Sequence, residues 1–494
     1  MREVNIRIFE LKRKEMQKYP SLNVNQEFDR SITISNLKLS HLEYKNVEGK
    51  NLFERVKGFQ NLVGSLRKQK IILYERRNMS PPAQECYGMD DYGDIFYGIN
   101  FASADYLGLC TNEQAKEAAI NAAKEYSVNS CGAPLAFGAS KYYMQLKEEL
   151  KDYWGMKEVI LYSAGWLAGF GVIKGLIRPY DYVVMDELCH NCLTEGAFAA
   201  TKNVLRVPHL SLEAMENKVS EIRQTNPNAC ILVVTEGLFS MDSDYTDLVA
   251  LQKMTLKYEA FLLIDCAHDF GCMGKTGKGV FELQGLQDFS NVLLMSGGSK
   301  CLSTNVGWVA CNSFEVIDYL KFFSSAYMFT NSVNPVQCAT ALAQLRILNS
   351  EVGSRLRKKV LENYHYMKKE LNSRGYQIIG YPSPILPLLI GNELVCRVVT
   401  RLMIDEGIHC NGIEYPIVRM GQARLRVNLQ PQHTKEHMDT FIETFHFCYQ
   451  KASKIVEESL EKYQLSLEQQ EQQQQAQSKV NFNDNRMELK KPKL

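Results

Sequence analysis

The chain lacks the features that would place it in a special structural class. Its 494 residues carry 57 Lys and Arg against 56 Asp and Glu, so no basic excess favours nucleic acid as a partner. Its most apolar uncharged stretch, residues 159–173, falls short of the ~20 residues that a membrane-spanning helix needs. The 14 cysteines show no repeated metal spacing, and the C-x-x-C formed by Cys189 and Cys192 is a weak signal alone. We therefore expect a globular protein with reduced thiols in the cytosol.

The two ends of the chain differ in composition from its middle. Residues 1–90 are polar and poorly periodic, which predicts an extension with a helix at 52–77; the acids near its start disfavour a mitochondrial presequence without excluding one. Residues 456–494 contain a glutamine-rich run and a basic end, which predicts a disordered tail or a frayed helix. The predicted units are 1–90, 91–349, 350–455 and 456–494.

Between the ends, short apolar runs alternate with amphipathic stretches of helical length. Such β-branched runs are typical of a mostly parallel sheet that is covered by helices on both faces. Residues 91–349, in which Thr111 or Asn112 caps the first helix, therefore predict an α/β domain with a seven-stranded sheet. Residues 350–455, with a strand at Tyr376–Gly380, predict a smaller α+β domain. The strands expected in the sheet are Val159–Tyr162, Tyr182–Met185, Val204–Val207, Cys230–Thr235, Phe261–Asp265, Val292–Met295 and Gly307–Cys311.

The residues that follow these runs carry the functional signal, because ligands of open α/β sheets lie at the carboxyl ends of the strands. A small-residue loop that opens a helix suits a phosphate group. A lysine for a Schiff base, a carboxylate for a pyridinium nitrogen and a ring-sized histidine complete what pyridoxal phosphate requires. The candidate residues are Ala164, Gly165, Trp166, His190, Asp265, His268, Ser299 and Lys300.

Each candidate alone also has a structural explanation. Lys300 could be a solvated surface lysine, His190 a hydrogen-bonded structural histidine, and Asp265 a turn cap. Arg424 and Arg426 lie two apart on a predicted strand and could face outward as a pair. The order of the candidates at consecutive strand ends favours the cofactor site.

Several segments resemble the α-oxoamine synthase family of fold-type-I pyridoxal phosphate enzymes, over residues 99–448. Asn100–Leu109 is similar to the family's N-Y-L-G-L segment, and Asp186–His190 is similar to D-E-L-N-H. Asp265–Gly279 matches D-E-A-H followed by spaced glycines, with Cys266 in place of Glu. The remaining matches are Glu236–Asp242, similar to E-x-x-[FY]-S-M-[DE], and Ala423–Arg426, similar to A-R-L-R. The combination is specific, although no single segment is.

Within the family, Tyr126–Gly132 resembles most the sphingolipid branch, the serine palmitoyltransferases. The sequence departs from that pattern at Ala133–Gly138, where the family's Arg is missing. It also has Gly297 where the family often has a phosphate-binding Thr or Ser, and Val306-Gly307 where the family has two glycines. These departures concern substrate choice and cofactor affinity more than the cofactor chemistry.

The resemblance implies a role for each matching residue. Lys300 would form the Schiff base with the cofactor and move the α-proton of the amino acid. Asp265 would keep the ring nitrogen protonated, because an opposite charge favours the charged form. His268 would hydrogen-bond the phenolic oxygen, and His190 would stack on the ring. Arg426 would bind the amino acid carboxylate through its planar guanidinium.

The resemblance also implies substrates and partners. Thr330 begins a segment that resembles the one reaching the phosphate of a neighbouring subunit, so we expect a homodimer or a heterodimer with a related subunit. The best prediction is decarboxylative condensation of serine with a long-chain acyl-CoA, in the cytoplasm, with association with the endoplasmic reticulum membrane left open. The alternatives are a glycine-using synthase for acetyl- or succinyl-CoA, a family member that serves only as a structural or regulatory subunit, and another pyridoxal phosphate enzyme such as an aminotransferase.

Overall fold

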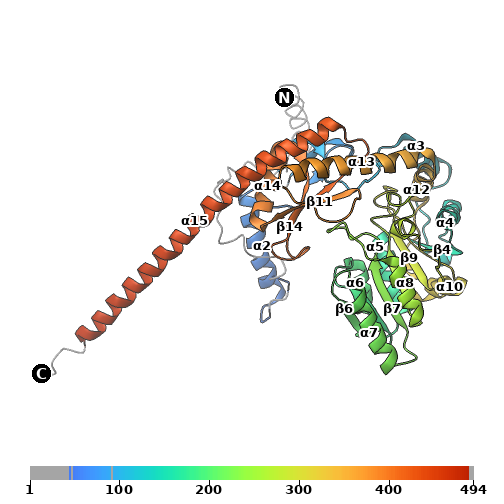
Figure 1. Cartoon of the computed structure of the whole chain (residues 1–494), viewed down its shortest axis with the longest axis horizontal. Helices are drawn as coiled ribbons and strands as arrows, with labels where there is room; N and C mark the ends of the chain where they lie inside the picture. The colour runs from blue at the N-terminus through green and yellow to red at the C-terminus, as the bar shows by residue number, and fades with distance from the viewer. Residues whose placement is uncertain (1–43, 46–47, 91–92, 489–494) are drawn as a thin grey trace.

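The computed structural model describes residues 44–45, 48–90 and 93–488; the first 43 residues of the predicted extension lie outside them. The seven-stranded sheet and its helices form one side of the molecule, and the smaller sheets form the other (Figure 1). The long C-terminal helix α15 (Lys435–Glu488) runs past the smaller sheets and far beyond the rest of the chain (Figure 1). In the part of the chain that the structure describes, no helix is long and apolar enough to cross a membrane.

The seven-stranded sheet confirms the predicted α/β architecture. Its order is β4-β10-β9-β8-β7-β5-β6. Strand β10 runs antiparallel to both of its neighbours, and the other neighbouring strands pair in parallel. The strands are β4 (Glu158–Tyr162), β5 (Tyr182–Asp186), β6 (Val204–Val207), β7 (Ile231–Glu236), β8 (Phe261–Asp265), β9 (Val292–Gly297) and β10 (Gly307–Cys311).

Helices cover both faces of this sheet, because successive strand residues point to opposite sides and both sets are apolar. Val183 and Leu263 join the core on one face, whereas Val184 and Leu262 join the core on the other. The first face is covered by α5 (Gly165–Leu176), α6 (Asn191–Ala200), α10 (Phe314–Phe323) and α11 (Ser325–Met328). The second face is covered by α4 (Lys141–Trp154), α7 (Leu212–Thr225), α8 (Leu248–Lys257), α9 (Val280–Leu283) and α12 (Pro335–Leu348), and α3 (Glu113–Glu125) packs against α12.

Two smaller sheets build the other side of the molecule. One has the order β11-β14-β13 and is antiparallel; the other has the order β1-β2-β3-β12. Because β3 pairs with β12, strands from before residue 101 belong with the C-terminal unit. The predicted unit boundaries stay a prediction. The elements here are β1 (Arg77–Asn78), β2 (Glu85–Met89), β3 (Ile95–Asn100), α13 (Glu351–Ser373), β11 (Ile385–Gly391), α14 (Glu393–Asp405), β12 (Ile408–His409), β13 (Asn411–Ile413) and β14 (Ala423–Asn428).

Local predictions differ from the structure at several element ends. The helix expected at 52–77 is α2 (Leu52–Lys68), and Lys70 directly after it has a left-handed backbone with φ of 55°. Asn112, not Thr111, caps α3 by accepting a hydrogen bond from the backbone of Ala115 at 3.1 Å. The strand expected at Tyr376–Gly380 is wrong, since this segment has only an isolated bridge to β11.

Of the two states predicted for the C-terminal tail, disorder and a frayed helix, the structure shows a helix. Helix α15 packs on the core through residues as far along as Val456, and its backbone continues as helix to Glu488. Glutamine, glutamate, leucine and lysine all have good intrinsic helix propensity, which favours a helix in this segment. The last residues, 489–494, lie outside the described part of the chain.

A buried ion pair holds the small domain together. Arg397 on α14 donates from Nε to Glu414 Oε2 at 2.6 Å and from Nη2 to Oε1 at 2.8 Å, and the two side chains are 7% and 8% exposed. The paired geometry compensates the cost of removing both charges from water.

Glu414→Gln is expected to lower the free energy of unfolding by roughly 3–5 kcal/mol, because it leaves the guanidinium buried without its counter-charge. Urea unfolding of purified protein measures the change, and Glu221→Gln in the exposed Lys218–Glu221 pair is the control, expected to change stability by less than ~1 kcal/mol. Equal effects of the two variants would contradict the role given to the buried pair.

Candidate active site

A cavity of about 250 Å³ opens at the carboxyl ends of the central strands. This is where an open α/β sheet places its ligands. All the candidates that follow strand ends line it: Ala164, Gly165, Trp166, His190, Asp265, His268, Ser299 and Lys300. Cys192, Ala267, Met295, Gly297 and Asn305, to which the sequence assigned no role in binding, complete the lining. The cavity lining does not include Thr330 or Arg426.

The N-terminus of α5 forms one wall of the cavity. Ala164 is the N-cap and makes no side-chain capping bond, so the first backbone N–H groups are available to an anion. Gly165 and Gly297 touch here, because a Cβ on either one would lie 3.0 Å from the Cα of the other. This close approach explains why Gly297 carries no side chain.

Lys300 and Asp265 carry opposite charges on neighbouring walls of the cavity. Burial lowers the pKa of Lys300, the Arg426 guanidinium lowers it further, and Asp265 opposes the shift. Burial raises the pKa of Asp265, while His190 and Lys300 oppose that shift. The amine is therefore easier to deprotonate than an ordinary lysine, which is what a Schiff-base nucleophile requires.

Tyr106 links the cavity wall to Arg426, a connection that sequence reasoning missed. Its hydroxyl lies 2.7 Å from His268 Nδ1 and accepts a hydrogen bond from Arg426 Nη2 at 2.8 Å. Burial lowers the pKa of His268 well below its usual value, and Lys300 and Arg426 add to the shift, so His268 is neutral. Arg426 Nε is buried and has no partner among the described residues. Tyr106 lies in the Asn100–Leu109 segment, and the similarity of this segment to the family was the sequence signal that could have identified it.

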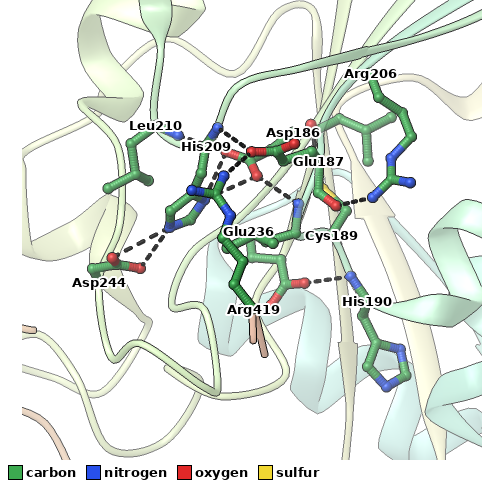
Figure 2. Close-up of polar contacts among 12 residues, drawn as sticks. Asp186, Glu187, Cys189, His190, Arg206, His209, Leu210, Glu236, Asp244 and Arg419 are labelled. Atoms are coloured by element: carbon green, nitrogen blue, oxygen red, sulfur yellow. Dashed lines mark hydrogen bonds and ion pairs between the residues drawn. The ribbon is translucent and has the colours of Figure 1, made fainter. Parts of the chain in front are cut away.

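His190 stands at the N-terminus of α6 on the edge of the cavity. Its Nδ1 accepts a hydrogen bond from the backbone of Cys192 at 3.3 Å and lies 3.0 Å from the Cys192 sulfur. Its own backbone N–H donates to Glu236 Oε1 at 2.6 Å (Figure 2). Burial, together with Asp265, raises the pKa of Glu236 well above its usual value. Glu236 was part of a segment matched to the family, but its contact with His190 joins the ends of β5 and β7, which are neighbours in the sheet and far apart along the chain.

The outward-facing explanation of the arginine pair is wrong. Arg424 is 3% exposed, and its Nη1 donates to Asp242 Oδ1 at 2.6 Å and to the carbonyl of Met241 at 3.0 Å. Strand β14 is thereby attached to the loop after β7. Thr330 is half-buried beyond α11, outside the cavity, and its role in a neighbouring subunit stays a prediction.

The donor set fits pyridoxal phosphate. An amine with a lowered pKa, a buried carboxylate, a neutral histidine and a helix N-terminus without a capping side chain all face one cavity. When bound, this cofactor supplies an electron sink for negative charge at the α-carbon of an amino acid. Lys300, Asp265, His268 and His190 are the residues that would hold it.

Known proteins resemble this chain over most of its length. The family model for aminotransferase class I and II matches residues 98–445. The serine palmitoyltransferase of Sphingobacterium spiritivorum is 30% identical over 392 residues, which are 79% of this chain and 95% of that protein. The 8-amino-7-oxononanoate synthase of Geotalea daltonii is 31% identical over 337 residues, 68% of this chain and 85% of that protein.

The fold matches solved structures as well. The serine palmitoyltransferase of Sphingomonas wittichii superposes with a TM-score of 0.76 at 22% identity, covering 82% of this chain and 99% of that one. The chain therefore belongs to the aminotransferase class I and II family. Within it, the chain is an α-oxoamine synthase homologue and a pyridoxal phosphate-dependent enzyme.

Lys300→Ala is expected to remove the visible absorbance that pyridoxal phosphate gives when it binds covalently, because no other amine in the cavity lining can form the Schiff base. Spectrophotometric titration of the purified variant measures this, with far-ultraviolet circular dichroism as the check on folding. Lys275→Ala, at an exposed lysine, is the control and should titrate like the wild type. A full-intensity band in the Lys300 variant would show that the assignment is wrong.

Proposed function

We propose that this enzyme condenses serine with a long-chain acyl-CoA. In this reaction the serine α-carbon loses its proton and bonds to the thioester carbonyl carbon, and the C–S bond breaks to release CoA. The serine carboxylate then leaves as CO₂, and the electron pair left on the α-carbon takes up a proton. The observation that supports an amino acid substrate is Arg426, whose buried Nε has no partner within the described part of the chain and whose Nη2 contacts Tyr106 beside His268. A bidentate guanidinium in this position suits a carboxylate.

Support for serine and a long acyl chain comes from the sphingolipid-type segment Tyr126–Gly132 and from the relative in Sphingobacterium, 95% of which the chain covers. A second candidate, 8-amino-7-oxononanoate synthesis, is favoured by relatives of that name at about the same identity. A purely structural or regulatory role is disfavoured by Lys300, half-buried opposite Asp265 and with a lowered pKa, since a scaffold has no use for that costly arrangement.

The proposed roles follow from the chemistry of each side chain. Lys300, when neutral, accepts the proton from the amino acid α-carbon. Asp265 stabilises positive charge on the ring nitrogen of the bound cofactor. Arg426 orients the amino acid through its carboxylate, and the neutral His268 can donate or accept one hydrogen bond without adding charge. His190, which lines the cavity, would cover one face of the cofactor ring and exclude water from it.

A dimer is also part of the proposal. Phe137 and Phe329 are 101% and 79% exposed, which is costly for aromatic side chains in water. Ser332, which ends the segment begun by Thr330, donates its backbone N–H to the carbonyl of Gly132 at 2.9 Å, so this segment lies beside the end of Tyr126–Gly132. A second copy, or a related subunit, would cover them. The cytoplasmic location, with the endoplasmic reticulum surface left open, stays a prediction.

The assay that tests the substrate proposal combines serine, glycine and alanine each with acetyl-, succinyl- and palmitoyl-CoA and measures the release of free CoA. Serine with palmitoyl-CoA should give a kcat/KM at least about tenfold above any other pair, a difference of ~1.4 kcal/mol. A preference for glycine or alanine, or for a short acyl chain, would overturn the proposed substrates.

Asp265→Asn is expected to retain the cofactor and lower turnover by about 100-fold or more, since a neutral amide cannot favour a protonated ring nitrogen; ~1.4 kcal/mol is tenfold in rate. Steady-state kinetics at saturating cofactor measures the loss, and Asp288→Asn at an exposed acid is the control. A loss below about tenfold would contradict the role of Asp265.

Arg426→Lys keeps the charge but removes the planar fork, so the KM for serine should rise by about tenfold or more while that for acyl-CoA stays within about twofold. The visible spectrum of the enzyme with cofactor alone should not change. Arg355→Lys, at an exposed position on α13, is the matched control. An unchanged KM for serine would mean that another group binds the carboxylate.

A further inference from the structure

His209 lies outside the cavity lining and contacts two carboxylates, Asp186 at the end of β5 and Asp244 in the loop after β7. It follows β6, and its Nδ1 lies 2.9 Å and 3.0 Å from the two oxygens of Asp186 (Figure 2). Its Nε2 lies 3.2 Å from both oxygens of Asp244 (Figure 2). Because each ring nitrogen faces a carboxylate, the ring satisfies both only when both nitrogens carry a proton.

The charge of this ring follows from the same contacts. Burial disfavours the charged form, but the hydrogen bonds and charges of Asp186 and Asp244 outweigh it and raise the pKa of His209 to about 10. Glu187, which accepts from the backbone of His209 at 3.4 Å, and Arg419, which pairs with Glu187, are the other charged groups nearby. The ring is therefore a fixed cation at neutral pH.

Asp186 also accepts hydrogen bonds from the turn that ends at His190, so its contact with His209 helps to fix that turn. Its Oδ1 accepts from the backbone of Leu188 at 2.8 Å, and its Oδ2 accepts from Leu210 at 2.8 Å. The turn is held at its other end by the bond from the His190 backbone to Glu236. Asp186 is 1% exposed, so loss of its counter-charge would leave a buried carboxylate unpaired.

Asp244, the second carboxylate bound by His209, lies beside a contact with the small domain. Its backbone carbonyl accepts from Phe239 at 2.9 Å, and the Phe239 ring stands edge-on to His209 with centroids 4.6 Å apart. Ser243, directly before Asp244, accepts a backbone bond from Tyr381 of the small domain at 2.7 Å. The imidazole thus connects a cavity wall with a contact between the two domains.

We propose that His209 is a positioning residue, which holds the 186–190 turn so that His190 faces the cofactor, and which couples this turn to the contact with the small domain. The inference rests on the proposed cofactor role of His190. It concerns the chain's own residues, so it can be tested with and without pyridoxal phosphate.

The decisive variants are His209→Gln, which removes the charge, and His209→Lys, which keeps it. His437→Gln is the matched control, because His437 also pairs with a carboxylate, Glu85, at 3.1 Å, but away from the cavity. Hydrogen exchange followed by mass spectrometry measures how strongly the backbone amides of residues 186–190 and 239–246 are protected in the full chain without cofactor. Visible circular dichroism of the chain with pyridoxal phosphate reads the surroundings of the ring.

His209→Gln should speed exchange in both segments by about tenfold and reduce the visible dichroism by about half, and His209→Lys should restore part of each. The free energy of unfolding of the wild type should exceed that of His209→Gln, and the difference should be largest below pH ~6.5. It should shrink as the pH rises toward 10, because a group with a raised pKa stabilises the fold only while it is charged.

Unchanged exchange in residues 186–190 of the His209→Gln variant would overturn the proposal, as would equal effects of His437→Gln. If the wild type binds no pyridoxal phosphate, the proposed function fails, and the exchange measurement still decides whether His209 holds the turn. Should His209→Gln not fold, Asp244→Asn carries the same comparison, because it removes one of the two carboxylates that hold the ring.

Discussion

The placement of the half-buried Lys300 opposite the buried Asp265 is the arrangement on which the rest of the site depends. An amine and a carboxylate removed from water are costly, and they are retained because each partly offsets the charge of the other. The sheet makes this possible by ending neighbouring strands β8 and β9 at one edge, so that Asp265 closes one strand and Lys300 follows the next. Glu236, at the end of β7, adds a further buried acid beside them. The walls of the cavity are thus set by parallel pairing, and its electrostatics by burial.

Much of this fold could be predicted from the sequence, because strands buried on both faces read as continuous apolar runs. Three of the expected strands, including Phe261–Asp265, match the observed bounds, and all the candidates at strand ends line one cavity. Tyr106, Cys192 and His209 could not be assigned, since their roles depend on contacts between segments that are distant along the chain. The pairing of β3 with β12, more than 300 residues away, is non-local for the same reason. For the glutamine-rich tail the sequence left disorder and a frayed helix both open, because good helix propensity there comes without an apolar face in the sequence.

The two domains are joined at the mouth of the site by polar contacts. Arg424 reaches Asp242 in the loop after β7, and Arg419 reaches Glu187 in the turn before His190. Arg426, on the same strand as Arg424, reaches Tyr106 at the cavity wall. One strand of the small domain therefore contributes both to the attachment of the domains and to the group proposed to bind the amino acid. Any shift between the domains would change the position of Arg426 relative to Lys300.

The central claim is that pyridoxal phosphate bonds covalently to Lys300 in this chain. Borohydride reduction of the protein incubated with pyridoxal phosphate, followed by proteolysis and mass spectrometry, locates the attached group directly. The account predicts a single reduced phosphopyridoxyl group on the peptide that contains Lys300, at close to one group per chain. Labelling spread over exposed lysines, with Lys300 unmodified, would contradict it.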